Sequence, residues 1–367
     1  GTKSRPTFME VAGVIDGIGG EFNAFTSKDR TGYYAKADFK HLDIALDVVS
    51  DIYLNSKLES AEIEKEKGAV LQELNMYEDT PTRSIGDLFE QLLYGKNPLG
   101  RDIIGYKESI NAFTRDDFAS YLKRSYLSNE TVVCVAGKFN EGRVISQVRQ
   151  YFSGMKKGKK SAIERVTDDQ KEPVVKIKFK KTDQTHLIIG VRAYDEYHKD
   201  RFALSLLAVI LGGNMSSRLF TEVREKLGLA YYVRTNVDSY EDSGYLATQA
   251  GVEHKNVSLT IKTIAREYKR IAKELVQEKE FQRAKDFVKG KSVMNMESSD
   301  EVAMFYIDQA IRKQKIMTLD EIFKKIDAVK TSDILRVAKD IFQEKKLNLA
   351  IIGPHKIEES LKNLLKL

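Results

Sequence analysis

The chain resembles itself, and this internal repeat constrains its fold more than any other feature of the sequence. Residues 110 to 137, INAFTRDDFASYLKRSYLSNETVVCVAG, align without a gap on residues 326 to 353, IDAVKTSDILRVAKDIFQEKKLNLAIIG. Both segments predict a helix entry that carries an Asp, then an amphipathic helix, then a buried strand that ends in glycine. The repeat therefore indicates two domains built on one plan.

A second pair of segments supports the duplication. The segment DRTGYYAKA aligns on EDSGYLATQA, which places Gly32 on Gly244 and Tyr33 on Tyr245. The first of these segments is followed by a helix over 41 to 54 with apolar residues at the spacing of a core-facing stripe: Leu42, Ala45, Leu46, Val49, Ile52 and Tyr53. Its counterpart is the run from Val257 to Ile271. Each half thus predicts helices packed on a mostly antiparallel sheet, which is the α+β class.

A polar, lysine-rich segment separates the two copies and predicts the domain boundaries. We expect an N-terminal domain over 1–153, a linker over 154–173 that ends at Pro173, and a C-terminal domain over 174–367. The lysine cluster in this linker is typical of a solvated connection, although a phosphate or membrane patch is the alternative.

Composition excludes several classes of protein. Hydrophobic residues make up 42% and charged residues 31% of the 367 residues, as in soluble globular proteins, and no apolar run is long enough for a membrane span. The net charge of +6 is spread thinly, so neither a nucleic acid nor a membrane is an expected partner. The one cysteine, Cys134, lies in an apolar run and predicts a buried strand residue. A chain without disulfides fits a reducing compartment, or any compartment where a large core makes them unnecessary, and we expect the cytoplasm. The chain starts at Gly1 without a signal peptide, which indicates a cut or a tag remnant.

Complete catalytic motifs are missing from the printed sequence. Its five histidines never lie three or four residues apart, so neither HExxH nor HxxEH is present, and no Cys/His cluster forms a full zinc site. The sequence also lacks a G-x-S-x-G elbow, a P-loop and a strand-linked G-x-G-x-x-G. Serine hydrolases, NTPases and dinucleotide enzymes are therefore disfavoured.

One helix carries a spaced pair of carboxylates. The segment 60 to 79 predicts a helix whose apolar stripe faces a core and consists of Ile63, Val70, Leu74 and Tyr77. Glu66 and Glu73 are two turns apart with about 20° of angular drift, so they share one face beside that stripe. Spacing alone leaves a solvated surface face as the alternative interpretation.

The sequence of this helix resembles that of a known family. EIEKEKGAVLQELNMYEDTP is similar to the segment of pitrilysin/insulinase peptidases, the family of mitochondrial processing peptidase, that carries their glutamate zinc ligand. Other segments agree in order and spacing: GTKSRPT at the start, GGEFNAFTSKDRTGYYAKA at 19 to 37, YGKNPLGRDIIGYKESI at 94 to 110 and NMSSRLFTEVREKLGLAYYV at 214 to 233.

The resemblance implies a zinc site shared with residues upstream. In that family the two histidines of HxxEH lie on a helix before the stretch that resembles GTKSRPT, and the family's spacing counted back from Glu73 places them before Gly1. The resemblance implies that Glu73 is the third Zn²⁺ ligand and that Glu66 is the acidic residue that steadies the site. Aligning Met76 with Met296 places Val293 at the position of Glu73, so the second copy lacks the metal glutamate.

The resemblance also implies substrate contacts. An extended peptide would pair with an edge strand at Asn23, Ala24 and Phe25, and Arg224 and Tyr231 would contact it and stabilise the tetrahedral intermediate. Without the family pattern, Arg224 reads as a helix-surface cation and Tyr231 as a half-buried strand residue.

Two functions follow as hypotheses. The first is a zinc endopeptidase that cleaves peptides or unfolded polypeptides and needs a second copy or a homologous subunit to supply the facing half, with the printed chain inactive alone because it lacks HxxEH. The second is a non-catalytic subunit or scaffold of the same fold. The joint presence of five of these residues favours the peptidase: Glu66, Glu73, Asn23, Arg224 and Tyr231.

Overall fold

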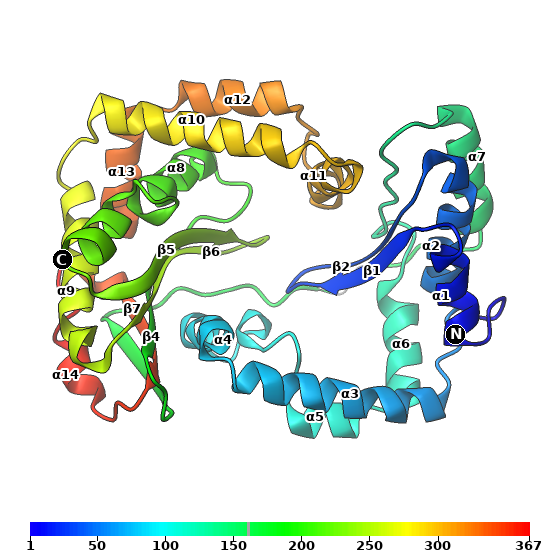
Figure 1. Ribbon diagram of the computed structural model, residues 1–367, viewed down its shortest axis with the longest axis horizontal. Helices are drawn as coiled ribbons and strands as arrows, with labels where there is room; N and C mark the ends of the chain where they lie inside the picture. Colours follow the sequence, from blue (N-terminus) through cyan, green and yellow to red (C-terminus); the bar gives the residue numbers. More distant parts are fainter. Residues whose placement is uncertain (160–161) are drawn as a thin grey trace. The chain divides into compact units, whose positions relative to one another are not determined.

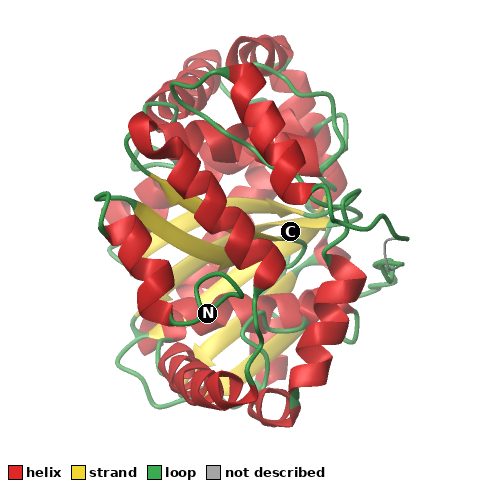
Figure 2. Cartoon of the chain, turned by 90° about the vertical axis from the view of Figure 1, so that its right-hand side faces the viewer, coloured by secondary structure: helices red, strands yellow, loops and turns green. Residues whose placement is uncertain are grey.

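The computed structural model describes residues 1–159 and 162–367, which form two compact units that interleave along the chain (Figure 1). Unit 1 consists of residues 1–74, 103–163 and 295–316, and unit 2 of residues 75–102, 164–294 and 317–367. Helices make up most of the secondary structure, as the colouring in Figure 2 shows. The combination of helices with sheets confirms the α+β class. No helix among the described residues combines the length and apolar character that a membrane crossing requires.

Unit 1 is helical around a two-stranded sheet. Its elements are α1 (Phe8–Asp16), β1 (Glu21–Thr26), β2 (Thr31–Lys36), η1 (Phe39–His41), α2 (Leu42–Asn55), α3 (Ser60–Glu78, which runs on into unit 2), α5 (Lys107–Ala112), α6 (Arg115–Ser125), α7 (Glu141–Phe152) and α11 (Ser299–Ile311). Strands β1 and β2 pair antiparallel. The buried apolar cluster here is small and joins α1 to α2 through Val11, Ile15 and Val48.

Helix α11 comes late in the sequence and yet belongs to unit 1. Two ion pairs connect it to the β1–β2 hairpin: Arg30 contacts Asp308 at 3.3 Å, and Lys36 donates to Asp300 at 2.7 Å. The hydrogen bond from Lys36 lowers the pKa of Asp300 to about 2, so the carboxylate stays charged at neutral pH.

Unit 2 contains a five-stranded sheet with the order β3-β7-β4-β6-β5, in which only the β3–β7 pair is parallel. Its strands are β3 (Val174–Phe179), β4 (Thr185–Ala193), β5 (Ala230–Ser239), β6 (Gly244–Val252) and β7 (Asn348–Gly353). Its helices are α4 (Pro81–Tyr94), η2 (Pro98–Gly100), α8 (Arg201–Gly212), the π-helix η3 (Phe220–Lys226), η4 (His254–Asn256), α9 (Val257–Ile271), α10 (Glu278–Asn295), α12 (Leu319–Ala328), α13 (Thr331–Ile341), η5 (Glu344–Lys346) and α14 (Glu358–Lys362).

Helices cover both faces of this sheet. Because side chains alternate along a strand, Leu349 and Ile351 of β7 pack into the large core formed with α8, α9 and α13, whereas Ala350 and Ile352 pack against α4 on the opposite face. All six residues of β7 are buried. The sheet is thus the interior of unit 2.

The repeat identified in the sequence is borne out for its helices and fails for one strand. The helices α6 and α13 coincide residue for residue with the alignment, and their C-cap residues, Tyr126 and Phe342, share one backbone conformation (φ −88°, ψ 73° and φ −85°, ψ 72°). The strand predicted at the end of the first copy is wrong, because residues 131–136 form no strand, whereas its counterpart forms β7.

Cys134 is accordingly half-buried rather than a buried strand residue. Burial still raises the pKa of its thiol, which disfavours the reactive thiolate.

The predicted domain boundaries at residues 153 and 174 stay a prediction. The described part of the predicted linker contains no helix or strand after Ser153, and residues 160–161 lie outside the described residues. The second half of the predicted linker belongs to unit 2. There the backbone N–H of Val166 donates to Asp242 at 2.8 Å, and the Gln170 amide donates to the carbonyls of Lys345 and Leu347.

Candidate functional site

Helix α3 forms where the sequence predicted it and carries both candidate carboxylates on an open surface. The segment lacks proline and ends where the Thr80 hydroxyl donates to the carbonyl of Met76 at 2.8 Å. The prediction that its apolar stripe faces a core is only partly correct, since Ile63, Val70, Leu74 and Tyr77 are all half-buried and no residue of α3 is fully buried. The helix therefore presents its carboxylates to solvent.

The acidic residues of α3 differ in their partners. Glu62 and Glu64 pair with Lys65 and Lys67, at 3.9 and 2.7 Å. Glu66 and Glu73 are exposed and form no hydrogen bond or ion pair with the residues that the structure describes. Seven residues of helix separate the Cα atoms of Glu66 and Glu73 by about 10 Å. These two carboxylates are thus available to a cation or to another chain.

The described residues do not form a complete metal site. No cluster of three or more His, Cys, Asp or Glu side chains occurs among residues 1–159 and 162–367. Zinc sites in proteins combine imidazole or thiolate ligands with carboxylates, and catalytic ones use three protein ligands. Glu73 can be one carboxylate ligand of such a site, with Glu66 as a charged neighbour, but the printed chain does not place a histidine beside them.

Four of the five histidines make contacts elsewhere, as expected from their spacing. His186 is buried in β4 beside the Tyr232 hydroxyl at 3.0 Å, and burial lowers its pKa. His254 and His355 both contact the Thr185 hydroxyl, at 2.8 and 2.7 Å. The ring of His198 stacks on Tyr194. These histidines have structural contacts within unit 2.

Strand β1 carries the predicted substrate edge. It pairs with β2 alone among the described strands, so its other edge is open. Asn23 and Ala24 are exposed and Phe25 is half-buried. The Asn23 side chain accepts a hydrogen bond from the backbone N–H of Ala24 at 2.8 Å, which satisfies one donor of this strand. An added strand would have to displace that contact.

Arg224 and Tyr231 are brought together, although they lie in different elements. Arg224 belongs to the π-helix η3, and its guanidinium lies 4.9 Å from the Phe220 ring centroid and 5.9 Å from that of Tyr231. Gly228 reverses the chain between them with φ +59°, a conformation that favours glycine. The result is an exposed cation beside an exposed phenol.

Tyr231 is an interruption of β5. The register between β5 and β6 shifts between Ala230 and Tyr232, which makes Tyr231 the extra residue of a β-bulge. Its side chain is 75% exposed rather than half-buried. Bulges and π-helical turns both redirect side chains and are frequent at functional sites. Neither irregularity has a clear local sequence signal, and the family resemblance was the only pointer to these residues.

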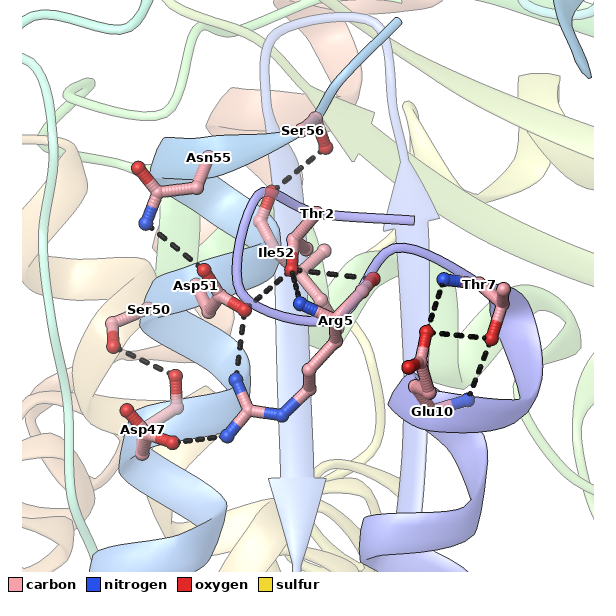
Figure 3. Close-up of polar contacts among 10 residues, drawn as sticks. All are labelled: Thr2, Arg5, Thr7, Glu10, Asp47, Ser50, Asp51, Ile52, Asn55 and Ser56. Carbon is pink, nitrogen blue, oxygen red and sulfur yellow. Dashed lines mark hydrogen bonds and ion pairs between the residues drawn. The ribbon is translucent and has the colours of Figure 1, made fainter. Parts of the chain in front are cut away.

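The opening segment GTKSRPT is a structural anchor, which the sequence reasoning missed. Figure 3 shows Arg5 reaching Asp47 and Asp51 of α2, and the hydroxyl of Thr2 donates to Asp51 at 2.5 Å. Burial alone would raise the pKa of Asp51, but hydrogen bonds from Thr2, Asn55 and Arg5 outweigh it and lower the pKa. The available signal was the pair of aspartates one turn apart, Asp47 and Asp51, on a mostly apolar helix.

The second copy of the carboxylate helix is α10. There Asp286 accepts a hydrogen bond from Gln282 at 2.9 Å, and Val293 is exposed. The position aligned with Glu73 thus holds an apolar side chain that does not ligate metals.

Comparison with known proteins assigns the class and then the family. Two solved structures share the fold: a protease from Helicobacter pylori (TM-score 0.89, 23% identity, covering 96% of this chain and 86% of that one) and a "peptidase M16 inactive domain" from Pseudomonas fluorescens (TM-score 0.88, 18% identity, covering 98% and 86%). The chain is therefore a two-unit α+β protein with the M16 peptidase fold.

Sequence relatives identify the family. The family described as "Insulinase (Peptidase family M16)" matches residues 1–107, and "Peptidase M16 inactive domain" matches residues 112–288. An uncharacterized zinc protease of Mycobacterium leprae is 32% identical over 99% of this chain and 82% of its own length. One of Bacillus subtilis is 34% identical over 96% and 85%. The chain belongs to the insulinase family, peptidase family M16, which confirms the resemblance seen in the sequence.

Proposed function

We propose that this chain is the greater part of a zinc-dependent endopeptidase that cleaves peptides or unfolded polypeptides. The observation that carries the proposal is the pair of exposed, unpartnered carboxylates, Glu66 and Glu73, on the helix α3 of a chain whose family is a peptidase family. The names of the relatives, which describe uncharacterized zinc proteases, support it.

In this proposal Glu73 is one of three zinc ligands, and two histidines come from residues outside the printed 367. The described residues contain no cluster of three ligands, which is why the proposal assigns two of them to residues outside the chain. The curated relatives compared above are also longer than their matched regions. Bound zinc would supply a water whose pKa is lowered toward about 7 for attack on a peptide carbonyl. Glu66 would accept a hydrogen bond from the ring N–H of a ligand histidine and add negative charge near the metal.

The chain's own residues would hold the substrate. The open edge of β1 at Asn23, Ala24 and Phe25 offers backbone groups for an extended peptide. Arg224 and the Tyr231 hydroxyl would donate hydrogen bonds to the oxygen on which charge develops. We further propose that a second copy or a homologous subunit completes the enzyme, because one chain of this length corresponds to one half of the enclosing family architecture.

A non-catalytic subunit is the alternative function. The family name of residues 112–288, which says "inactive domain", fits it weakly, because such a domain also accompanies a catalytic one. A scaffold has no physical requirement for two unpartnered carboxylates on one face of α3.

The test is the zinc content of the natural gene product carrying Glu73→Gln. The amide removes the negative charge of the proposed ligand, and we expect metal occupancy to fall by about tenfold or more, since ligand shells are sensitive to such changes. Glu62→Gln, an exposed glutamate on the same helix, is the matched control and should leave zinc unchanged.

Equal zinc contents in wild type and Glu73→Gln would rule out the ligand assignment. We also expect the printed chain alone to lack peptidase activity that a chelator removes. Such activity from these 367 residues would mean that other residues complete the metal site.

A further inference from the structure

The segment that presents Arg224 and Tyr231 is irregular at both ends. Helix η3 is a seven-residue π-helix, and Tyr231 is the bulged residue of β5. Extended π-helices are rare, since π-helical structure occurs mostly as single-turn bulges within α-helices. Such a segment keeps its shape only if its surroundings hold it.

Three features hold this segment from within. The side chains of Leu219, Phe220 and Val223 are buried in the core of unit 2. At the end of the turn, the N–H of Leu229 donates to the carbonyl of Val223 at 2.9 Å, and the N–H of Gly228 donates to that of Arg224 at 3.2 Å. These bonds resemble the glycine-dependent closure at the end of many helices.

A fourth contact comes from a distant element. Arg218, two residues before η3, donates through Nε and Nη2 to the two carboxylate oxygens of Glu280 on α10, at 2.9 and 2.8 Å. The two side chains are 10% and 19% exposed. Arg283 of α10 adds a hydrogen bond from its guanidinium to the carbonyl of Ser216 at 3.3 Å. Glu280 and Arg283 of α10 therefore both bind the turn that precedes η3.

The Arg218–Glu280 pair is poorly explained by a contribution to stability alone, because burying the two charges costs solvation free energy. Nη1 of Arg218 is buried and has no hydrogen-bond partner within the described residues. Burying an ion pair loses solvation, and apolar replacements of the same volume are often equally stable or more so. A two-point fork, however, fixes direction as well as distance, which an apolar contact does not.

We propose that the Arg218–Glu280 ion pair is a positioning device, which sets the π-helical turn so that the Arg224 guanidinium stays beside the Tyr231 ring. The catalytic meaning of this inference rests on the proposed peptidase function, whereas its geometric content does not. Arg218 acts through the turn and does not itself contact the substrate.

The test replaces Arg218 with methionine and reads out the ring of residue 231 directly. The printed chain contains no tryptophan, so Tyr231→Trp introduces a single fluorescent reporter beside Arg224. We expect Arg218→Met to lower the emission anisotropy of this indole, because the guanidinium loses its fixed place. Glu280→Gln, which keeps the shape and one acceptor oxygen, should act in the same direction and serves if the methionine variant does not fold.

Arg336→Met is the matched control. Arg336 donates to both carboxylate oxygens of Asp200 at 2.7 and 2.8 Å, so it is a bidentate pair in the same unit. Asp200 directly precedes the twelve-residue α8, which is about 18 Å long, whereas Arg218 follows that helix in the chain. The control should leave the anisotropy unchanged.

Kinetics of the natural gene product provide the second readout. In the zinc-loaded protein with its native Tyr231, we expect Arg218→Met to lower kcat by about tenfold or more with KM within about twofold, since misplacing a transition-state contact affects kcat. Zinc content should not change. Anisotropy and kcat that both match the Arg336→Met control would overturn the proposal. If the wild-type product cleaves no peptide, the proposed function fails, while the anisotropy experiment still decides the positioning role.

Discussion

The two copies of the repeated segment, residues 110–137 and 326–353, have similar sequences but different surroundings. Helix α6 of the first copy has no buried residue, whereas α13 of the second buries Ile334, Val337, Ala338 and Ile341. Residues 131–136, after α6, form no strand and are partly exposed, whereas β7 is buried throughout. The same pattern of residues therefore occupies a surface in one unit and an interior in the other.

The difference teaches which properties are local. Both helices begin after a residue in extended conformation, have an Asp at the third helical position, and end at the same aligned residue, so their limits are set within the segment. A strand, in contrast, needs neighbours for its backbone groups. β7 lies between β3 and β4, while residues 131–136 pair with no strand among the described residues.

The largest difference between the copies should appear on truncating a strand side chain. Ile351 of β7 is fully buried, and we expect Ile351→Ala to lower the free energy of unfolding by about 2–5 kcal/mol, because it leaves a cavity. The aligned residue of the first copy is Val135, which is half-buried, and Val135→Ala should cost less than about 1 kcal/mol. Urea denaturation measures both. Equal losses would break the comparison by showing that Val135 is packed as tightly as Ile351.

At the helix starts we expect a smaller difference, and here the first copy should lose more stability than the second. The Thr114 side chain accepts a hydrogen bond from the N–H of Asp117, whereas Lys330 at the same position of α13 makes no side-chain cap. Thr114→Ala should therefore destabilise by about 1 kcal/mol, and Lys330→Ala by close to nothing. The urea midpoints of the two variants test this, and a loss at Lys330 as large as that at Thr114 would contradict it.

The smallest difference should be found in acid. Hydrogen bonds from the Thr114 hydroxyl and backbone lower the pKa of Asp117, and the backbone N–H of Lys330, with help from Arg336, lowers that of Asp333. A lowered folded-state pKa stabilises the protein above the unfolded pKa of about 3.9, and this stabilisation is lost as the pH falls through the folded pKa. Both copies should thus lose this stabilisation over the same pH range, below about 3.9.

Stability measured from about pH 5 down to about pH 2 in Asp117→Asn and Asp333→Asn provides the check. Each variant should lose part of the acid sensitivity of the wild type, by similar amounts. A much larger change for one aspartate would show that the helix caps are less alike than their geometry indicates.

The sequence predicted the limits of the helices better than it predicted what each element packs against or pairs with. The run from Val257 to Ile271 forms α9 with those limits, and the carboxylate helix forms as α3, because helix periodicity and end signals are short-range. The expectation of a core behind α3 was only partly correct and that of a strand after α6 was wrong, because burial and pairing depend on what other segments place there. Strand order and the parallel β3–β7 pair have no local signal.

The candidate site shows the same limit. Glu66 and Glu73 share a face because their spacing is a helical one. The approach of Arg224 to Tyr231 depends on a π-helix and a bulge that hydrophobic periodicity does not encode. The Arg218–Glu280 pair joins residues 62 positions apart and the Arg5–Asp51 pair residues 46 apart, so only the folded chain reveals them.

The interleaving of the two units has a consequence for synthesis. Unit 1 includes residues 295–316, and the ion pair between Arg30 and Asp308 joins residues 278 positions apart. At translation rates of about 5–20 residues per second, Arg30 would wait roughly 14 to 56 s on the ribosome before its partner is made. Folding of the N-terminal part during translation therefore cannot reach completion early, and an incomplete unit 1 is a form that a nascent chain has to pass through.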